Sequence, residues 1–314
     1  MVGEPLNLVF AGTPPFAVPS LNSLAGAGFK ISLVVTQPDR PKGRGMEVAH
    51  SPVKQRATEL GLPLTQPEKI KNNLEFRSQL ESLRPQAIIV VGYGRLIPQW
   101  MLDLPPLGNI NVHASLLPKY RGAAPIQWAI ANGEGETGVT IMKIDAGLDT
   151  GDILLQRSMR IEEDDTSETL SLRMAHLGAD LLLETINRLR KGEIALRPQD
   201  HSRASLAPLL KKEDGIIDFE RTAQEICNRL RGFQPWPGAF TSFRGKLLHI
   251  WSASTDLKNL PQAEITIEDE RMLVGCGAGT TLVPEQLQPE GKKRMSVRDF
   301  VHGYHPRPGE VLGR

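Results

Sequence analysis

Asn111, His113 and Asp149 carry side chains that could do chemistry on a carbonyl group. Asn111 and His113 lie in the run Asn-Ile-Asn-Val-His, and Ser115 follows two residues later. Side chains alternate across a strand, so a strand here places Asn111, His113 and Ser115 on one face. Asp149 lies in the stretch Asp145 to Gly151, whose glycines permit tight turns close to a ligand. We expect the Asp149 carboxylate to approach His113.

This trio suits the attack of an amine on a carbonyl carbon. The tetrahedral intermediate carries an oxyanion, to which the Asn111 amide and an imidazole N–H of His113 can donate hydrogen bonds. A carboxylate at Asp149 can hold the His113 tautomer and accept or relay the proton that the amine loses. Ser115 has no second base at a recognisable spacing, so we predict direct attack without an acyl-enzyme. Taken singly, each residue of the trio is more typical of a structural role, and the hypothesis depends on the set.

The elements that must position the trio read as a parallel sheet covered by helices. Short apolar runs alternate with helical patterns over the first two hundred residues, which is typical of that fold class. The predicted strands are Asn7 to Ala11, Ile31 to Thr36, Ala87 to Val91, Ile110 to His113, and Val139 to Ile144. Leu116 to Pro118 end the fourth strand, so the trio lies near the carboxyl edge, where open α/β sheets bind ligands.

Two helices are predicted from their capping residues. Ser51-Pro52 supplies an N-cap and a first-turn proline, and Gly61 ends that helix. A second helix starts near Thr166, where Asp165 and Glu168 have the spacing of a capping box. Its apolar residues recur on one face, which should pack on the sheet.

A change of pattern after residue 192 indicates a second domain. We expect a Rossmann-like domain over 1–193, a polar and proline-punctuated linker over 194–208, and a further domain over 209–314. In the last of these, a helix near Thr222 to Arg231 precedes short strands and a turn at Arg244-Gly245. That pattern is typical of a small β-barrel.

Composition narrows the classes of function. A length of 314 residues favours two domains, and a net charge of +1 means that any polyanionic partner is held by local patches. The sequence has no apolar run of about 18 residues and no secretory signal at its start, so we expect a cytoplasmic protein with no membrane segment. Cys227 and Cys276 lie far apart without a CxxC pattern. We therefore expect neither a disulfide framework nor a metal site.

A specific resemblance to a known family adds to this interpretation. The run Ser115 to Pro125, with Asn111 and His113 before it and Asp149 after it, resembles the signature of folate-dependent formyltransferases. The resemblance implies that these three residues are catalytic and that the formyl donor is 10-formyltetrahydrofolate. It also implies that Val90 to Pro98 border the pterin pocket. The residues that it implies for contact with the folate are Ser115, Leu116, Leu117 and Pro118.

The similarity runs nearly end to end and is greatest to the members of this superfamily that formylate the methionyl amine of initiator tRNA. It implies a Rossmann-like domain joined to an OB-like barrel that assists tRNA binding, in a monomer. The motifs that carry it are Ala11 to Pro14, Thr36 to Pro41, Gly43 to Gly45, Ser51 to Lys54, Pro235 to Pro237 and Gly291 to Lys293.

One stretch of the sequence can meet phosphates. Gln37 to Gly45 carries Arg40, Lys42 and Arg44 among prolines and glycines, which indicates an exposed basic loop. In the family this loop enters the acceptor stem of the tRNA, and Arg44 matches its important arginine. Met46-Glu47 stands where the family often has lysines, so part of the phosphate contact differs here.

Other functions remain open at this point. A sugar-amine or glycinamide ribonucleotide formyltransferase would share the trio and the folate segment, but neither needs the basic loop and the barrel together. A formyl-folate hydrolase would use water as the acceptor. A noncatalytic tRNA-binding scaffold would not need the intact trio. A nicotinamide dehydrogenase needs GxGxxG after the first strand, and Gly12 to Pro15 reads Gly-Thr-Pro-Pro instead.

Overall fold

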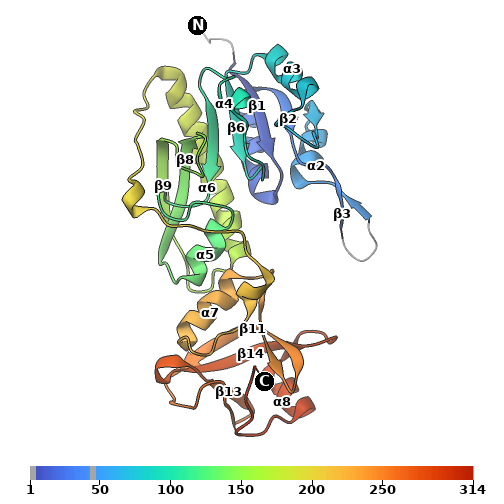
Figure 1. Cartoon of the computed structure of the whole chain (residues 1–314), viewed down its shortest axis with the longest axis vertical. Coiled ribbons are helices and arrows are strands. Elements are labelled where there is room, and N and C mark those ends of the chain that lie inside the picture. The colour runs from blue at the N-terminus through green and yellow to red at the C-terminus, as the bar shows by residue number, and fades with distance from the viewer. Residues whose placement is uncertain (1–4, 43–46, 314) are drawn as a thin grey trace. The chain divides into compact units, whose positions relative to one another are not determined.

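The computed structural model describes residues 5–42 and 47–313, which fall into two compact units (Figure 1). Unit 1 contains the residues up to Pro125 together with Thr137–Met159 and Ser171–Ala207. Unit 2 contains Ile126–Glu136, Arg160–Leu170 and the residues from Pro208 onward. The domain limits predicted from the sequence, 1–193 and 209–314 with a linker at 194–208, stay a prediction.

A seven-stranded sheet forms the centre of unit 1, in the order β5-β2-β1-β6-β7-β8-β9. The five strands from β5 to β7 run parallel, which confirms the predicted Rossmann-like class. Strand β8 is antiparallel to β7, since the chain re-enters the sheet at the carboxyl end of β7, where His113 pairs with Thr140. The strand bounds are β1 (Asn7–Gly12), β2 (Lys30–Val35), β5 (Leu64–Thr65), β6 (Ala87–Val91), β7 (Asn109–His113), β8 (Glu136–Lys143) and β9 (Ile153–Arg160).

Alternation along the central strands separates the two faces of this sheet. Ile88 and Val90 of β6 belong to the apolar cluster that α3 and α4 cover. These two residues pair with Asn109 and Asn111 of β7, so both asparagines, and His113 two residues further, share that face. The Asn109 amide donates to the carbonyls that end α4, at 2.9 and 3.2 Å. The two residues that follow it on this face, Asn111 and His113, lie closer to the carboxyl edge of the sheet.

Within the described residues, the helices α1 to α6 alternate with the sheet strands along the chain, although most of α5 and the first turn of α6 belong to unit 2. Ser51 caps α2 as predicted, accepting a hydrogen bond from the Lys54 N–H at 3.0 Å. Gly178 of α6 lies against the β7–β8 side of the sheet, where an added Cβ would come within 2.9 Å of a Val112 methyl group. The bounds are α1 (Val18–Gly26), α2 (Pro52–Glu59), α3 (Leu74–Leu83), α4 (Gln99–Leu102), α5 (Pro125–Ala131) and α6 (Ser167–Lys191).

The cap of α6 differs from the prediction. Thr166 and Thr169 each accept the other's backbone N–H, at 3.0 and 3.3 Å, so they form the reciprocal cap in place of Asp165 and Glu168. The Asp165 carboxylate instead accepts the N–H of Glu162 at 2.8 Å and the hydroxyl of Thr169 at 2.9 Å. The predicted start of the helix is right, and the capping partners were wrong.

Unit 2 is built on an antiparallel sheet, which confirms the predicted second β domain. The strand order is β10-β11-β14-β13-β12, and β15 pairs with β14. Leu248 and Ile250 of β11 point into its core, together with Ile226 of α7 and Phe300 of α8. The bounds are β10 (Ala239–Phe243), β11 (Lys246–Asp256), β12 (Ile265–Glu268), β13 (Arg271–Gly275), β14 (Thr281–Pro289), β15 (Met295–Ser296), α7 (Ala223–Gly232) and α8 (Val297–Tyr304).

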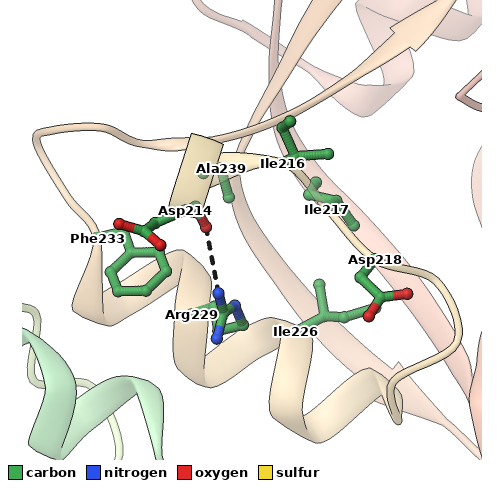
Figure 2. Close-up of a pocket in the computed structure, with 9 residues that line it drawn as sticks. Asp214, Ile216, Ile217, Asp218, Ile226, Arg229, Phe233 and Ala239 are labelled. Carbon is green, nitrogen blue, oxygen red and sulfur yellow. Dashed lines mark hydrogen bonds between the residues drawn. The ribbon is translucent and has the colours of Figure 1, made fainter. Parts of the chain in front are cut away.

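A half-buried cation joins α7 to the 3-10 turn Lys212–Gly215, which precedes this helix in the chain. Figure 2 shows Arg229 beneath this turn, where its guanidinium donates to the Asp214 carbonyl at 3.3 Å. The same group lies 4.8 Å from the centre of the Phe233 ring, a cation–π contact. Burial lowers the pKa of Arg229. Asp218 and the apolar side chains of Ile216, Ile217, Ile226 and Ala239 also line this hollow.

The cap of α7 gives a direct test of this unit's stability. Thr222 accepts the N–H of Glu225 at 3.2 Å, and the Glu225 carboxylate accepts the N–H of Thr222 at 2.9 Å. We expect Thr222→Ala to lower the free energy of unfolding by about 1 kcal/mol, because an N–H of the first turn loses its acceptor. Chemical denaturation measures the change. Thr222→Ser retains the hydroxyl and is the matched control, and an equal loss in both variants would contradict the role of the cap.

Candidate active site

The His113 ring is fixed by a backbone carbonyl. His113 ends β7, and its Nε2 lies 2.9 Å from the carbonyl oxygen of Tyr120. A carbonyl can only accept a hydrogen bond, so Nε2 carries the proton. In the neutral ring the lone pair is therefore on Nδ1.

The Asp149 carboxylate lies on the Nδ1 side of this ring. Its Oδ2 is 3.7 Å from His113 Nδ1 and accepts the backbone N–H of Gly122 at 2.8 Å. The structure thus brings together the two residues that we expected to meet. A separation of 3.7 Å exceeds a hydrogen bond, so the neutral Nδ1 is free to accept a proton from a third group. Once protonated, the ring gains a carboxylate partner.

This geometry places a condition on the oxyanion contact that we predicted for His113. The N–H of the neutral ring is already used by the Tyr120 carbonyl. The ring can donate to an oxyanion from Nδ1 only after Nδ1 has taken up a proton. Nδ1 of His113 would therefore first accept a proton and then donate a hydrogen bond to the oxyanion.

Asn111 lies two residues before His113 on the same face of β7. Its backbone is fixed on both sides, since it pairs with Val90 of β6 and Met142 of β8. The side chain is half-buried, and within the described ranges its amide has no hydrogen-bond partner. The amide is therefore available to donate hydrogen bonds on the face of β7 that also carries His113.

Two residues beside the ring adopt left-handed backbone conformations. Tyr120 has φ 61°, which turns its carbonyl toward His113, and Asp149 has φ 50°. Each such residue costs on the order of 1 kcal/mol and persists only where the surroundings hold it. Strain at both contacts of one imidazole is typical of a functional site.

The sequence did not reveal two of these contacts. The Tyr120 carbonyl and the Gly122 N–H belong to the backbone, and a pattern of side chains does not identify them. The glycine at position 122 could have indicated a close backbone approach there. Gly122 has φ 120°, and an added Cβ would lie 2.7 Å from the Ala207 carbonyl oxygen. Only glycine fits there.

The segment expected to contact folate follows directly after β7. Leu116 and Pro118 are half-buried, whereas Ser115 and Leu117 are buried. The Ser115 hydroxyl donates to the Lys119 carbonyl at 2.6 Å, so it holds the turn closed. Leu117 donates its N–H to the Thr140 hydroxyl at 3.1 Å. The turn is therefore tied to β8, and Leu116 and Pro118 are its more exposed side chains.

The basic loop starts from a two-stranded hairpin, β3 (Arg40–Lys42) and β4 (Glu47–Ala49). Arg40 is exposed, Lys42 ends β3, and Arg44 lies outside the described residues. Asp39 anchors the base of the hairpin: it accepts from Lys54, and from Gln66 and His50 at 2.9 Å each. The hydrogen bond from Lys54 is the largest cause that lowers the pKa of Asp39 to about 2.

No three His, Cys, Asp or Glu side chains in residues 5–42 and 47–313 are arranged to hold a metal ion. Among the helices of these same ranges, none is both long enough and apolar enough to cross a bilayer.

Comparisons with known proteins agree with the fold. The sequence-family model described as formyl transferase matches residues 6–186, and the one described as formyl transferase, C-terminal domain matches residues 209–305. The crystal structure of WlaRD, a sugar 3N-formyl transferase, shares the fold: its TM-score is 0.66 at 19% identity, over 93% of this chain and 100% of that one. The fold and the domain pair define a formyltransferase, which is an enzyme.

Curated relatives give a narrower assignment. The methionyl-tRNA formyltransferase of Koribacter versatilis (strain Ellin345) is 66% identical over 307 residues, covering 98% of each chain. The methionyl-tRNA formyltransferase of Acidobacterium capsulatum is 55% identical over 310 residues, covering 98% of this chain and 100% of its own. The chain belongs to the methionyl-tRNA formyltransferase family.

The close approach of the Asp149 loop to β8 can be tested by one methyl group. A Cβ at Gly151 would lie 1.9 Å from the Lys143 carbonyl oxygen, so Gly151→Ala must displace this loop. We expect kcat for formyl transfer to fall at least about tenfold, because Asp149 then moves relative to His113. Gly135→Ala is the control, since no atom lies within 4 Å of an added Cβ there. Unchanged steady-state rates in Gly151→Ala would show that the loop position is unimportant.

Proposed function

We propose that this enzyme transfers the formyl group of 10-formyltetrahydrofolate to the free amino group of methionyl initiator tRNA. The approach of Asp149 to His113, 3.7 Å between carboxylate and Nδ1, is the observation that carries the chemistry. The identity of the acceptor rests on the 66% identical relative, which is named a methionyl-tRNA formyltransferase. The product is N-formylmethionyl-tRNA, the form used in translation initiation.

In the first step the methionyl amine attacks the formyl carbon directly. The C–N bond forms, the formyl oxygen becomes an oxyanion, and the Asn111 amide donates to that oxygen. His113 Nδ1 accepts a proton from the attacking nitrogen. The Asp149 carboxylate, held by the Gly122 N–H at 2.8 Å, stabilises the imidazolium.

In the second step the intermediate collapses. The oxyanion re-forms the carbonyl, the bond from carbon to N10 of the folate breaks, and His113 Nδ1 returns its proton to N10. Tetrahydrofolate leaves with one added proton, and the ring is neutral again. The Tyr120 carbonyl keeps the Nε2 proton in place throughout, so the same nitrogen acts as base and then as acid.

The folate and the tRNA would be held by separate parts of unit 1. Ser115, Leu116, Leu117 and Pro118 form the turn after β7, and we assign them to the folate because they adjoin His113 in the chain. The tRNA phosphates would be met by the basic loop, to which Arg40, Lys42 and Arg44 belong. Asp39 holds the base of that loop with Lys54.

The proposal as a whole is tested with the purified protein, 10-formyltetrahydrofolate and methionyl initiator tRNA. Formation of formyl-methionine on the tRNA, at a rate well above that of formate release, supports it. Formate release as fast as transfer indicates a hydrolase. Transfer to a sugar amine in preference to the charged tRNA indicates the other branch of the family.

His113→Ala tests the acid–base role. We expect kcat to fall on the order of a hundredfold or more, because both the base and the later acid are lost. His176→Ala, which changes an exposed histidine on α6, is the control for the loss of an imidazole. Circular dichroism checks that the fold persists. Formylation within about twofold of the wild type by a folded His113→Ala protein would rule out the role.

Arg40→Ala and Arg44→Ala test the phosphate contacts of the basic loop. Each should raise KM for methionyl initiator tRNA without changing the affinity for folate. Each should also flatten the dependence of log K on log salt by about 0.7 to 0.9 per lost phosphate contact. Lys30→Ala removes an exposed cation at the opposite edge of the sheet, where β2 begins, and is the charge-matched control. An equal loss for tRNA and folate would count against the assignment.

A further inference from the structure

The Asp149 backbone needs an external support. Asp149 has φ 50°, a conformation that residues other than glycine adopt only where neighbouring groups hold them. Within its own loop, Asp145 accepts the N–H of Gly147 at 3.0 Å and the Thr150 hydroxyl at 2.7 Å. These bonds close the loop on itself, but neither reaches Asp149. Another part of the chain must hold that residue.

Gln199 supplies this support from fifty residues further along the chain. Its Nε2 donates to the Asp149 carbonyl at 2.9 Å and to the Gly151 carbonyl at 2.8 Å. The side chain is only 6% exposed, so water does not compete well for either bond. The two bonds hold the carbonyls of Asp149 and Gly151, and together they fix the backbone from which the Asp149 carboxylate projects.

Arg121 fixes the orientation of the Gln199 amide. The guanidinium donates to Gln199 Oε1 from Nε at 3.1 Å and from Nη2 at 2.6 Å. An amide whose oxygen accepts two bonds from a cation cannot turn over, so its NH2 group must face Asp149 and Gly151. Arg121 is 7% exposed, and within the described chain no carboxylate forms an ion pair with it. Burying a cation without a charged partner is costly. The Arg121 guanidinium nevertheless donates to the Gln199 amide oxygen, and its Nη2 lies 3.2 Å from His201 Nδ1.

These contacts converge on one short segment. Tyr120 accepts from His113, Arg121 orients Gln199, and Gly122 donates to Asp149. The segment is itself held by the chain around Ser205: Arg121 donates its N–H to the Ser205 carbonyl at 2.9 Å, and the Ser205 hydroxyl accepts the Tyr120 N–H at 2.9 Å. His113 is thus held by this segment directly, whereas the backbone of Asp149 is held by Gln199.

We propose that Gln199, oriented by Arg121, is a positioning residue that holds the Asp149 carboxylate beside His113. This inference rests on the proposed function of Asp149. Gln199 acts through the backbone carbonyls of Asp149 and Gly151 and not by contact with the reacting atoms. Replacing Gln199 should lower kcat only when the Asp149 carboxylate is present.

The test is a double-mutant cycle on the full chain. Gln199→Glu keeps an acceptor for Arg121 but replaces the donor to both carbonyls by a second acceptor. We expect kcat to fall on the order of tenfold to a hundredfold, with KM for both substrates little changed. In the Asp149→Ala background, Gln199→Glu should cause no further fall in kcat. Gln262→Glu, at an exposed position of unit 2, controls for the added charge.

The outcomes separate the positioning role of Gln199 from the catalytic role proposed for Asp149. An equal fall in kcat in both backgrounds, or no fall in the wild-type background, overturns the positioning role and leaves the proposed function standing. An Asp149→Ala enzyme as active as the wild type overturns the catalytic role of Asp149, and the inference with it. If Gln199→Glu does not fold, as judged by circular dichroism, Arg121→Lys enters the same cycle. It keeps a cation but loses the fork that orients the amide, so the same non-additivity is expected.

Discussion

The active site depends on one hydrogen bond, from His113 Nε2 to the Tyr120 carbonyl at 2.9 Å. Because a carbonyl cannot donate, this bond decides which nitrogen keeps its proton and which is free for chemistry. It directs Nδ1 toward the Asp149 side, where the carboxylate is near enough to stabilise a positive ring but too far to occupy Nδ1 while the ring is neutral. In the proposed mechanism a single nitrogen takes the proton of the attacking amine and returns it to the leaving group, without a second base.

The rest of unit 1 holds the two partners of this ring. Strand β7 lies between β6 and β8, which fixes the backbone of Asn111 and His113. The Tyr120 carbonyl and the Asp149 carboxylate both come from left-handed residues, each bound by segments distant in the sequence: Ser205 bonds to Tyr120 and Gln199 bonds to Asp149. The site is thus built from the end of β7, the turns that contain Tyr120 and Asp149, and the segment from Gln199 to Ser205. Contacts with backbone groups hold the two side chains that we propose to be catalytic, His113 and Asp149.

Much of this arrangement was predictable from local rules. Alternation along β7 placed Asn111 and His113 on one face, and Ser51 capped α2 as its sequence indicates. The capping partners of α6 were predicted wrongly because Asp165 accepts the N–H of Glu162 in the preceding turn, and Thr166 accepts the N–H of Thr169 in the helix. The direction of β8 depends on where the chain re-enters the sheet, which residue patterns do not encode. Gln199 was missed because a polar, proline-punctuated stretch has the composition of a linker, and its role depends on two bonds to distant carbonyls.

The tautomer of His113 tests the account most directly. Nitrogen-15 NMR of the labelled enzyme resolves the two ring nitrogens, and comparison with a His113-substituted variant assigns the signal among the 7 histidines of the chain. In the pH range where this imidazole is neutral, the account predicts a protonated Nε2 and an unprotonated Nδ1. A neutral ring with its proton on Nδ1 would contradict it, because the nitrogen required as the base would already carry a proton.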